Sequence, residues 1–201
     1  MTPNEATPQP ETPSVQPQIV AITATPSQDI ALDTISAWAD RQNFAFTVAT
    51  YSGQYEGSLS SASHGVARID ELDPAKFTSV VFVGGPSVTA LRGDADVLEL
   101  VAEIYHKNGV IAALGEGPQV LISAEMSQRI NLVRDRFVTG VPGIVDDLVN
   151  AGGIFEDVAA VNDESVVTGR DLRHFLDALD KAVTVSSQVA LFDNGNMVAI
   201  Q

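Results

Sequence analysis

The sequence predicts an α/β domain of three layers, in which helices cover both faces of a mostly parallel β-sheet, followed by a C-terminal β-hairpin. Short apolar runs such as 19–22 and 79–83 recur along the chain, and amphipathic segments such as 29–42 separate them. Continuous apolar strands are typical of parallel sheets, because both faces of such sheets are buried. The hairpin is predicted from Asn194-Gly195, which stands between two β-rich runs.

The elements are predicted in order from these patterns. Residues 51–73 are rich in glycine and serine and are predicted to form a small hairpin or excursion. Strands are expected at 19–22, 44–49, 79–83, 110–114, 137–138, 158–161 and 165–168, and the hairpin strands at 183–192 and 197–200. Helices are expected at 29–42, 94–107, 119–124, 142–150 and 171–183.

The 201 residues suit one such domain with short additions, and 45% of them are apolar. Residues 1–18 are predicted to be a disordered or polyproline-like tail, 19–183 the domain and 184–201 the hairpin, because the first segment holds five prolines and almost no apolar residues. No apolar run approaches the roughly 20 residues that span a bilayer. No signal peptide is visible, which favours a cytoplasmic location. An exported or envelope-tethered protein is the alternative, if a signal has been removed.

The charge balance excludes two classes of partner. Eleven basic residues stand against 26 acidic ones, a formal charge of −15. Nucleic acids and anionic membranes bind basic surfaces, so neither is expected as a partner. The chain has no cysteine, which excludes disulfides, thiolate metal sites and thiol nucleophiles.

Three predicted strand ends are candidates for a site, because ligands of open α/β sheets bind beyond the carboxyl ends of the strands. They are 23–26, 84–87 and 115–118. The third end combines a strand, a sharp Gly-x-Gly-Pro turn and a helix. This order resembles a nucleophile elbow, in which a strained residue is held over the start of a helix.

At this point the sequence resembles the DJ-1/PfpI family of the class I glutamine amidotransferase-like superfamily. Segments 81–86 and 111–121 look like the family's glycine pair and elbow, and the similarity continues through 138–142, 146–152, 161–163 and 166–171. It covers about 19–183. The resemblance implies a flavodoxin-like α/β/α sandwich and a homo-oligomer, such as a dimer.

The departures from the family pattern concern its reactive residues. The family's elbow reads Cys-His before Gly-Pro, and here those positions hold Gly115 and Glu116. The family's supporting glutamate aligns with Ala31, just after Gln28 and Asp29. Amidase or peptidase, glyoxalase or deglycase, and peroxide-sensing chemistry by the family's thiol route are therefore expected to be absent.

The candidate ligand-binding residues surround this elbow, and each has a purely structural interpretation as well as a functional one. Gly115 relieves strain or makes room for a ligand. Glu116 is a solvated carboxylate favoured by the helix dipole, or an acid/base group or metal ligand partnered by Asp29. The glycine pair forms a tight turn or supplies oxyanion donors, and Ser87 caps the next helix. The candidate ligand-binding residues are Asp29, Gly84, Gly85, Pro86, Gly115, Glu116 and Gly117.

The histidines do not indicate a metal site, because His64, His106 and His174 lack ligand spacing. No metal or cofactor is expected. The leading hypothesis is a catalytically inactive family member that binds a small ligand or associates with protein through the elbow pocket. The alternative is a non-thiol hydrolase or hydratase that uses Glu116 as acid/base with backbone donors at Gly84 and Gly85. A third hypothesis is an interaction module held near an envelope by the Pro-rich tail.

Overall fold

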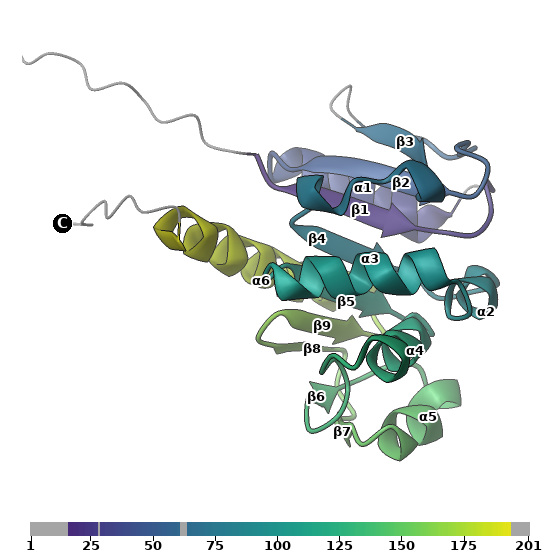
Figure 1. Ribbon diagram of the computed structural model, residues 1–201, viewed down its shortest axis with the longest axis vertical. Helices are drawn as coiled ribbons and strands as arrows, with labels where there is room; N and C mark the ends of the chain where they lie inside the picture. The colour runs from purple at the N-terminus through teal and green to yellow at the C-terminus, as the bar shows by residue number, and fades with distance from the viewer. Residues whose placement is uncertain (1–15, 28, 61–63, 194–201) are drawn as a thin grey trace, which may run out of the picture.

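The computed structural model describes residues 16–27, 29–60 and 64–193, and it confirms the predicted three-layer α/β architecture. Seven strands form the main sheet in the order β3-β2-β1-β4-β5-β9-β8 (Figure 1). All neighbours are parallel except β8 and β9, which are antiparallel. The strands are β1 Gln18–Ile22, β2 Ala45–Thr50, β3 Gly65–Arg68, β4 Ser79–Phe82, β5 Val110–Leu114, β8 Ala160–Asp163 and β9 Val166–Gly169. Strands β6 Phe137–Val138 and β7 Ile154–Phe155 form a separate parallel pair.

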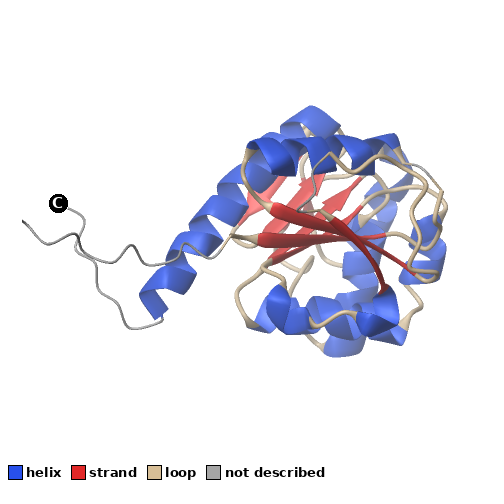
Figure 2. Cartoon of the chain, turned by 90° about the horizontal axis from the view of Figure 1, so that it is seen from above, coloured by secondary structure: helices blue, strands red, loops and turns tan. Residues whose placement is uncertain are grey.

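Helices cover both faces of the sheet (Figure 2). One apolar cluster joins the sheet to α1 Ile30–Arg41 and α6 Leu172–Asp193. On the opposite face a second cluster includes α2 Ser87–Leu91, α3 Ala95–His106, α4 Pro118–Gln128 and α5 Val145–Asn150. Short 3-10 turns lie at Ile69–Glu71, Pro74–Lys76 and Pro142–Ile144. The sheet therefore separates two cores.

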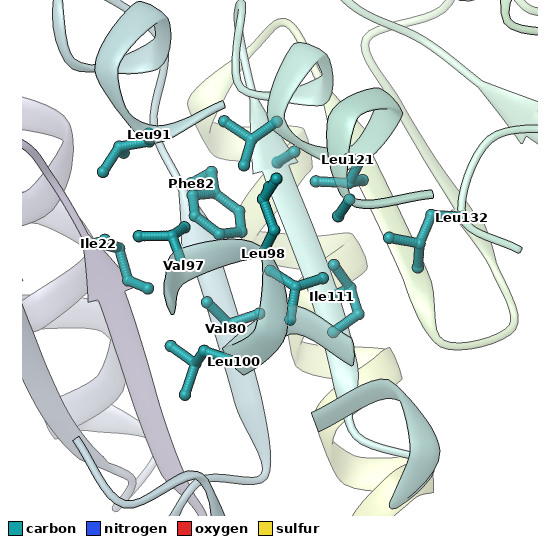
Figure 3. Packing of buried hydrophobic residues seen from close by; sticks show 14 of the residues in the cluster. Ile22, Val80, Phe82, Leu91, Val97, Leu98, Leu100, Ile111, Leu121 and Leu132 are labelled. Atoms are coloured by element: carbon teal, nitrogen blue, oxygen red, sulfur yellow. The ribbon is translucent and has the colours of Figure 1, made fainter. Parts of the chain in front are cut away.

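The alternation of side chains along the strands builds these two cores. In β4, Val80 and Phe82 enter the cluster under α3 and α4, whereas Val81 enters the cluster under α1 and α6. Figure 3 shows Phe82 packed among Val97, Leu98 and Leu121. Each such side chain contributes about 1.5–3 kcal/mol by leaving water, so the continuous apolar runs stabilise both layers at once.

Aspartate caps set where two helices begin. The Asp29 carboxylate accepts hydrogen bonds from the backbone N–H groups of Ala31 (2.8 Å) and Leu32 (3.3 Å). Asp94 serves α3 in the same way, accepting from Asp96 and Val97. These bonds satisfy N–H groups that have no partner inside the helix, so α1 and α3 start one residue after each aspartate.

Two predictions need correction: the form of the segment 51–73 and the N-terminal boundary of the domain. Of the two predicted alternatives for 51–73, the hairpin is wrong, because β3 pairs in parallel with β2 and the chain makes an excursion between them. The domain also includes Pro17 and Gln18, which the predicted boundary placed in the tail. The Pro17 carbonyl accepts from the Ala45 N–H (2.9 Å), and Gln18 opens β1.

The predicted C-terminal hairpin is wrong in its first half. Residues 183–192 are not a strand, because α6 continues without a break to Asp193 and its last turns run past the edge of the sheet (Figure 2). Ala182 and Val183 are buried against the domain, and helix propagation from this anchored turn outweighs the local β preference. The Asn-Gly pair and the second strand, 197–200, lie outside the described residues. Among the described helices none is both long and apolar enough to cross a membrane.

Candidate functional site at the elbow

The structure confirms the predicted strand–turn–helix elbow. Strand β5 ends at Leu114, Gly115 turns with a φ of +68°, and α4 begins at Pro118. The Gly115 N–H donates to the carbonyl of Gly169 at the end of β9 (2.8 Å), and the Gly117 N–H donates back to Leu114 (3.0 Å). The elbow is thus held by its own turn and by the neighbouring strand.

Packing does not force glycine at the elbow's first position. A Cβ added to Gly115 would lie 3.5 Å from the Cα of Gly84 and 3.7 Å from its nitrogen, which are ordinary contacts. Only the positive φ disfavours a side chain there, at a cost of order 1–3 kcal/mol. The backbone around Gly115 therefore leaves room for a Cβ at this position.

Gly117, in contrast, is required by contact. Its Cβ would lie 2.7 Å from the carbonyl oxygen of Phe82 and 2.9 Å from that of Leu114, both backbone atoms. This glycine lets the start of α4 approach the ends of β4 and β5 closely. It therefore sets the distance between the elbow and the strand ends.

Glu116 lies against Gly84, the first residue of the predicted glycine pair, and is partly buried. A Cβ added to Gly84 would collide with the Glu116 carboxylate and come within 2.7 Å of the Glu116 nitrogen, so Gly84 permits this close approach. Gly85 has a φ of +107°, is exposed and faces open space, and Pro86 after it is exposed. The structure therefore brings Gly84, Gly115 and Glu116 together and leaves Gly85 accessible.

Asp29, the predicted partner of Glu116, is used elsewhere. Its carboxylate is the cap of α1, and within the described chain no hydrogen bond joins it to the elbow. Ala31, at the position of the family's supporting glutamate, is the first residue whose N–H that cap holds. Asp29 therefore caps α1 and does not form the predicted acid pair with Glu116.

A hydroxyl pair formed after β1 and β4 was missed by sequence reasoning. Thr23 Oγ1 and Ser87 Oγ lie 2.8 Å apart, and both residues are buried. The prediction that Ser87 caps a helix is wrong, because Pro86 occupies the cap position of α2 and Ser87 bonds Thr23 instead. The signal available in the sequence was that each residue follows a strand, and β1 and β4 turn out to be neighbours.

Tyr55 ties the loop after β2 to the start of α1. Its hydroxyl donates to the Asp33 carboxylate (2.9 Å) and accepts from the Asp29 N–H (3.2 Å). Burial, followed by the hydrogen bond to the Asp33 carboxylate, raises the pKa of Tyr55 above its usual range. Burial and a hydrogen bond to Asp94 similarly raise the pKa of Tyr51 to about 12.

These two phenols predict a loss of stability at alkaline pH. The unfolded chain ionises its tyrosines near about pH 10, whereas the fold holds Tyr51 and Tyr55 neutral to higher pH. Their contribution is fully present below the unfolded pKa and is lost as the pH rises through the folded values. We expect urea midpoints to fall between about pH 9 and about pH 11, and to fall less in the variant Tyr51→Phe/Tyr55→Phe. An identical fall in both proteins would contradict this assignment.

The histidines lie apart from the elbow constellation. His64 Nδ1 hydrogen-bonds the buried Ser36 Oγ (2.8 Å), and His174 Nδ1 hydrogen-bonds Asp171 on the surface (2.6 Å). His106 ends α3, where a cation is favourable. In the part of the chain that the structure describes, no three His, Asp or Glu side chains are grouped so that they could hold a metal ion.

Curated relatives match about half to three fifths of this chain. It is 28% identical over 125 residues to a deglycase of Pyrococcus horikoshii, covering 60% of this chain and 72% of that protein. It is 36% identical over 103 residues to protein/nucleic acid deglycase 2 of Escherichia coli K12, covering 51% and 56%. This chain therefore spans only part of the length of each of these two relatives.

Solved structures and a family model agree with the fold. DJ-1beta of Drosophila melanogaster superposes with a TM-score of 0.68 at 20% identity, over 88% of this chain and 98% of that one. A two-domain protein of Anabaena variabilis with DJ-1/ThiJ/PfpI-like and ferritin-like domains gives 0.67 at 24% identity, over 83% and 48%. The model of the DJ-1/PfpI family matches residues 19–184. This chain therefore belongs to the DJ-1/PfpI family.

Proposed function

We propose that this protein is a catalytically inactive member of its family, which uses the elbow pocket to bind a small ligand or to associate with protein. The observation that carries the proposal is the elbow itself. Its backbone turn is intact, yet Gly115 places no side chain at the position of the family's nucleophile. A thiolate attacks carbonyls and a glycine cannot, so the deglycase reaction named for relatives has no nucleophile here.

The pocket that we propose for this role is formed by the glycine pair and the elbow. Gly85 is exposed with open space beside its α-carbon, and the partly buried Glu116 carboxylate lies next to Gly84. Backbone N–H groups and one carboxylate can bind a small polar ligand without reacting with it. A homo-oligomer, such as a dimer, remains a prediction that the family resemblance supplies.

A non-thiol hydrolase or hydratase is the second candidate, and the burial of Glu116 favours it. A partly buried carboxylate beside a glycine pair resembles a general base near oxyanion donors. The role of Asp29 as a helix cap counts against this candidate, because general acid/base work on one substrate commonly needs a second positioned group.

Turnover assays separate the two candidates. We expect no consumption of methylglyoxal and no hydrolysis of p-nitrophenyl esters or simple amides by the wild-type chain or by Glu116→Gln. Protein/nucleic acid deglycase 2 of Escherichia coli is assayed in parallel as a relative named for deglycase activity. Turnover that Glu116→Gln abolishes would refute the inactive assignment and support the second candidate.

The variant Gly115→Cys tests whether the elbow is still accessible. The chain has no other cysteine, so alkylation by iodoacetamide reports on this position alone. We expect the variant to fold, since its Cβ makes only ordinary contacts, and to be alkylated in the native state. A folded variant that reacts only after denaturation would contradict an open pocket.

A further inference from the structure

The outer face of α4 carries an unusually exposed apolar side chain between two hollows. Met126 is 79% exposed, while Ile122 and Ile130 near it are buried at 8% and 7%. A hollow of about 270 Å³ lies on one side, toward the segment 129–134. A second hollow of about 200 Å³ lies on the other side, toward α2 and α5. We call this region, with Met126 and both hollows, the Met126 surface.

Arginines surround the Met126 surface. Arg129 and Arg134 line the larger hollow, and Arg92 lines the smaller one. Among the described residues, nothing hydrogen-bonds or ion-pairs the Arg129 guanidinium. Arg92 Nε has only the Ser123 hydroxyl, at 3.4 Å. Guanidinium groups bind carboxylates with paired, directional hydrogen bonds, so Arg129 and Arg92 are available to an acidic partner, whereas Arg134 already lies near Glu125.

The carboxylates of the same surface are already engaged. One oxygen of Glu125 accepts hydrogen bonds from three consecutive backbone N–H groups, and the other lies 3.7 Å from Arg134 Nε. Asp147 accepts from the Gln119 side-chain amide (2.6 Å). The surface therefore carries three guanidinium groups and two engaged carboxylates, and Arg134 is the guanidinium that lies near one of them, on a chain whose formal charge is −15.

The backbone at Arg129 adds a second reason to assign a role to its side chain. Arg129 ends α4 with a φ of +57°, the left-handed conformation that glycine or asparagine usually supplies at this position. A residue with a Cβ is disfavoured in that conformation. This conformation also ends the helix and turns the backbone away from it at Arg129, which lines the larger hollow.

We propose that the Met126 surface docks an acidic segment of another protein, one that carries apolar side chains among its carboxylates. The apolar side chains enter the hollows beside Met126, whose flexible thioether adapts to different shapes. The carboxylates pair with Arg129, Arg134 and Arg92. The acidic remainder of the molecule repels such a segment, so local complementarity selects this face.

This proposal is independent of the elbow. Met126 lies at the other end of α4, about 12 Å along the helix from Pro118 at 1.5 Å per residue. In Figure 1 α4 lies between α3 and α5, on the opposite layer from α6.

Fluorescence anisotropy with a labelled peptide of alternating glutamate and leucine tests the docking surface. We expect saturable binding to the full chain, weakened at least about tenfold by Arg129→Glu and by Met126→Asp. Lys181→Glu is the matched control, because it makes the same charge change at an exposed position of α6. It should leave the affinity within about twofold, and circular dichroism verifies that each variant is folded.

Any of five results would overturn the proposal, and four of them concern the binding of the peptides. They are no binding of the peptide to the wild-type chain, equal weakening by Lys181→Glu, unchanged affinity in both Arg129→Glu and Met126→Asp, and equal binding of a glutamate-only peptide. The last result would indicate a site for anions alone, as would displacement of the peptide by an equal concentration of inorganic phosphate.

Discussion

Gly117→Ala is expected to destabilise the fold by about 3 kcal/mol, the upper range for overpacking a rigid site. The added methyl group would meet the carbonyl oxygens of Phe82 and Leu114 at 2.7 and 2.9 Å, and these atoms end two central strands. Neither strand can shift without disturbing the sheet. The φ of Gly117 is −48°, which suits alanine, so the cost comes from contact and not from backbone strain.

Urea unfolding of Gly117→Ala beside Gly143→Ala isolates that contact. A Cβ on Gly143 would meet no atom within 4 Å, so this control should change stability by no more than about 0.5 kcal/mol. If the Gly117→Ala midpoint matched that of the control, the elbow would have more freedom than its geometry implies.

Glu125→Ala is expected to cost about 3 kcal/mol through a different mechanism. The Glu125 carboxylate, 12% exposed, accepts from the N–H groups of Leu132 (2.8 Å), Val133 (2.6 Å) and Arg134 (3.1 Å). Removing it leaves N–H groups of the 130–134 segment without their charged acceptor, and each such bond contributes about 1.5–3 kcal/mol before water compensates.

Two further variants test the role of Glu125. Glu125→Gln keeps an acceptor oxygen and should lose clearly less stability than Glu125→Ala in the same denaturation experiment. Glu99→Ala removes an exposed carboxylate from α3 and should be nearly neutral. Equal losses for alanine and glutamine would mean that the charge of Glu125, and not its hydrogen bonding, holds the segment.

Much of the fold and part of the site could be predicted from local sequence. The apolar runs at 79–83 and 110–114 became β4 and β5, because a strand buried on both faces needs apolar side chains at every position. Asp29 and Asp94 marked helix starts, since capping depends on the next few residues only. The elbow was predictable for the same reason: Gly-x-Gly-Pro encodes its own turn.

Interactions between distant segments could not be predicted in this way. The Thr23–Ser87 pair requires β1 beside β4, and the Glu125 bonds require the chain to fold back beneath α4. The Asn-Gly pair favoured a hairpin after residue 183. Instead α6 continues to Asp193, because Val183 is buried in the core and anchors the helix there.

The sequence by itself determined the layers of this protein, the elbow and the absence of a thiol, because hydrophobic periodicity, turn chemistry and residue identity are local. The tertiary structure alone decided that Glu116 rests against Gly84 while Asp29 caps α1, so the two predicted acids serve different elements. It also decided that Met126 faces solvent among arginines. Helix placement over the sheet sets which side chains meet, and no local pattern encodes that placement.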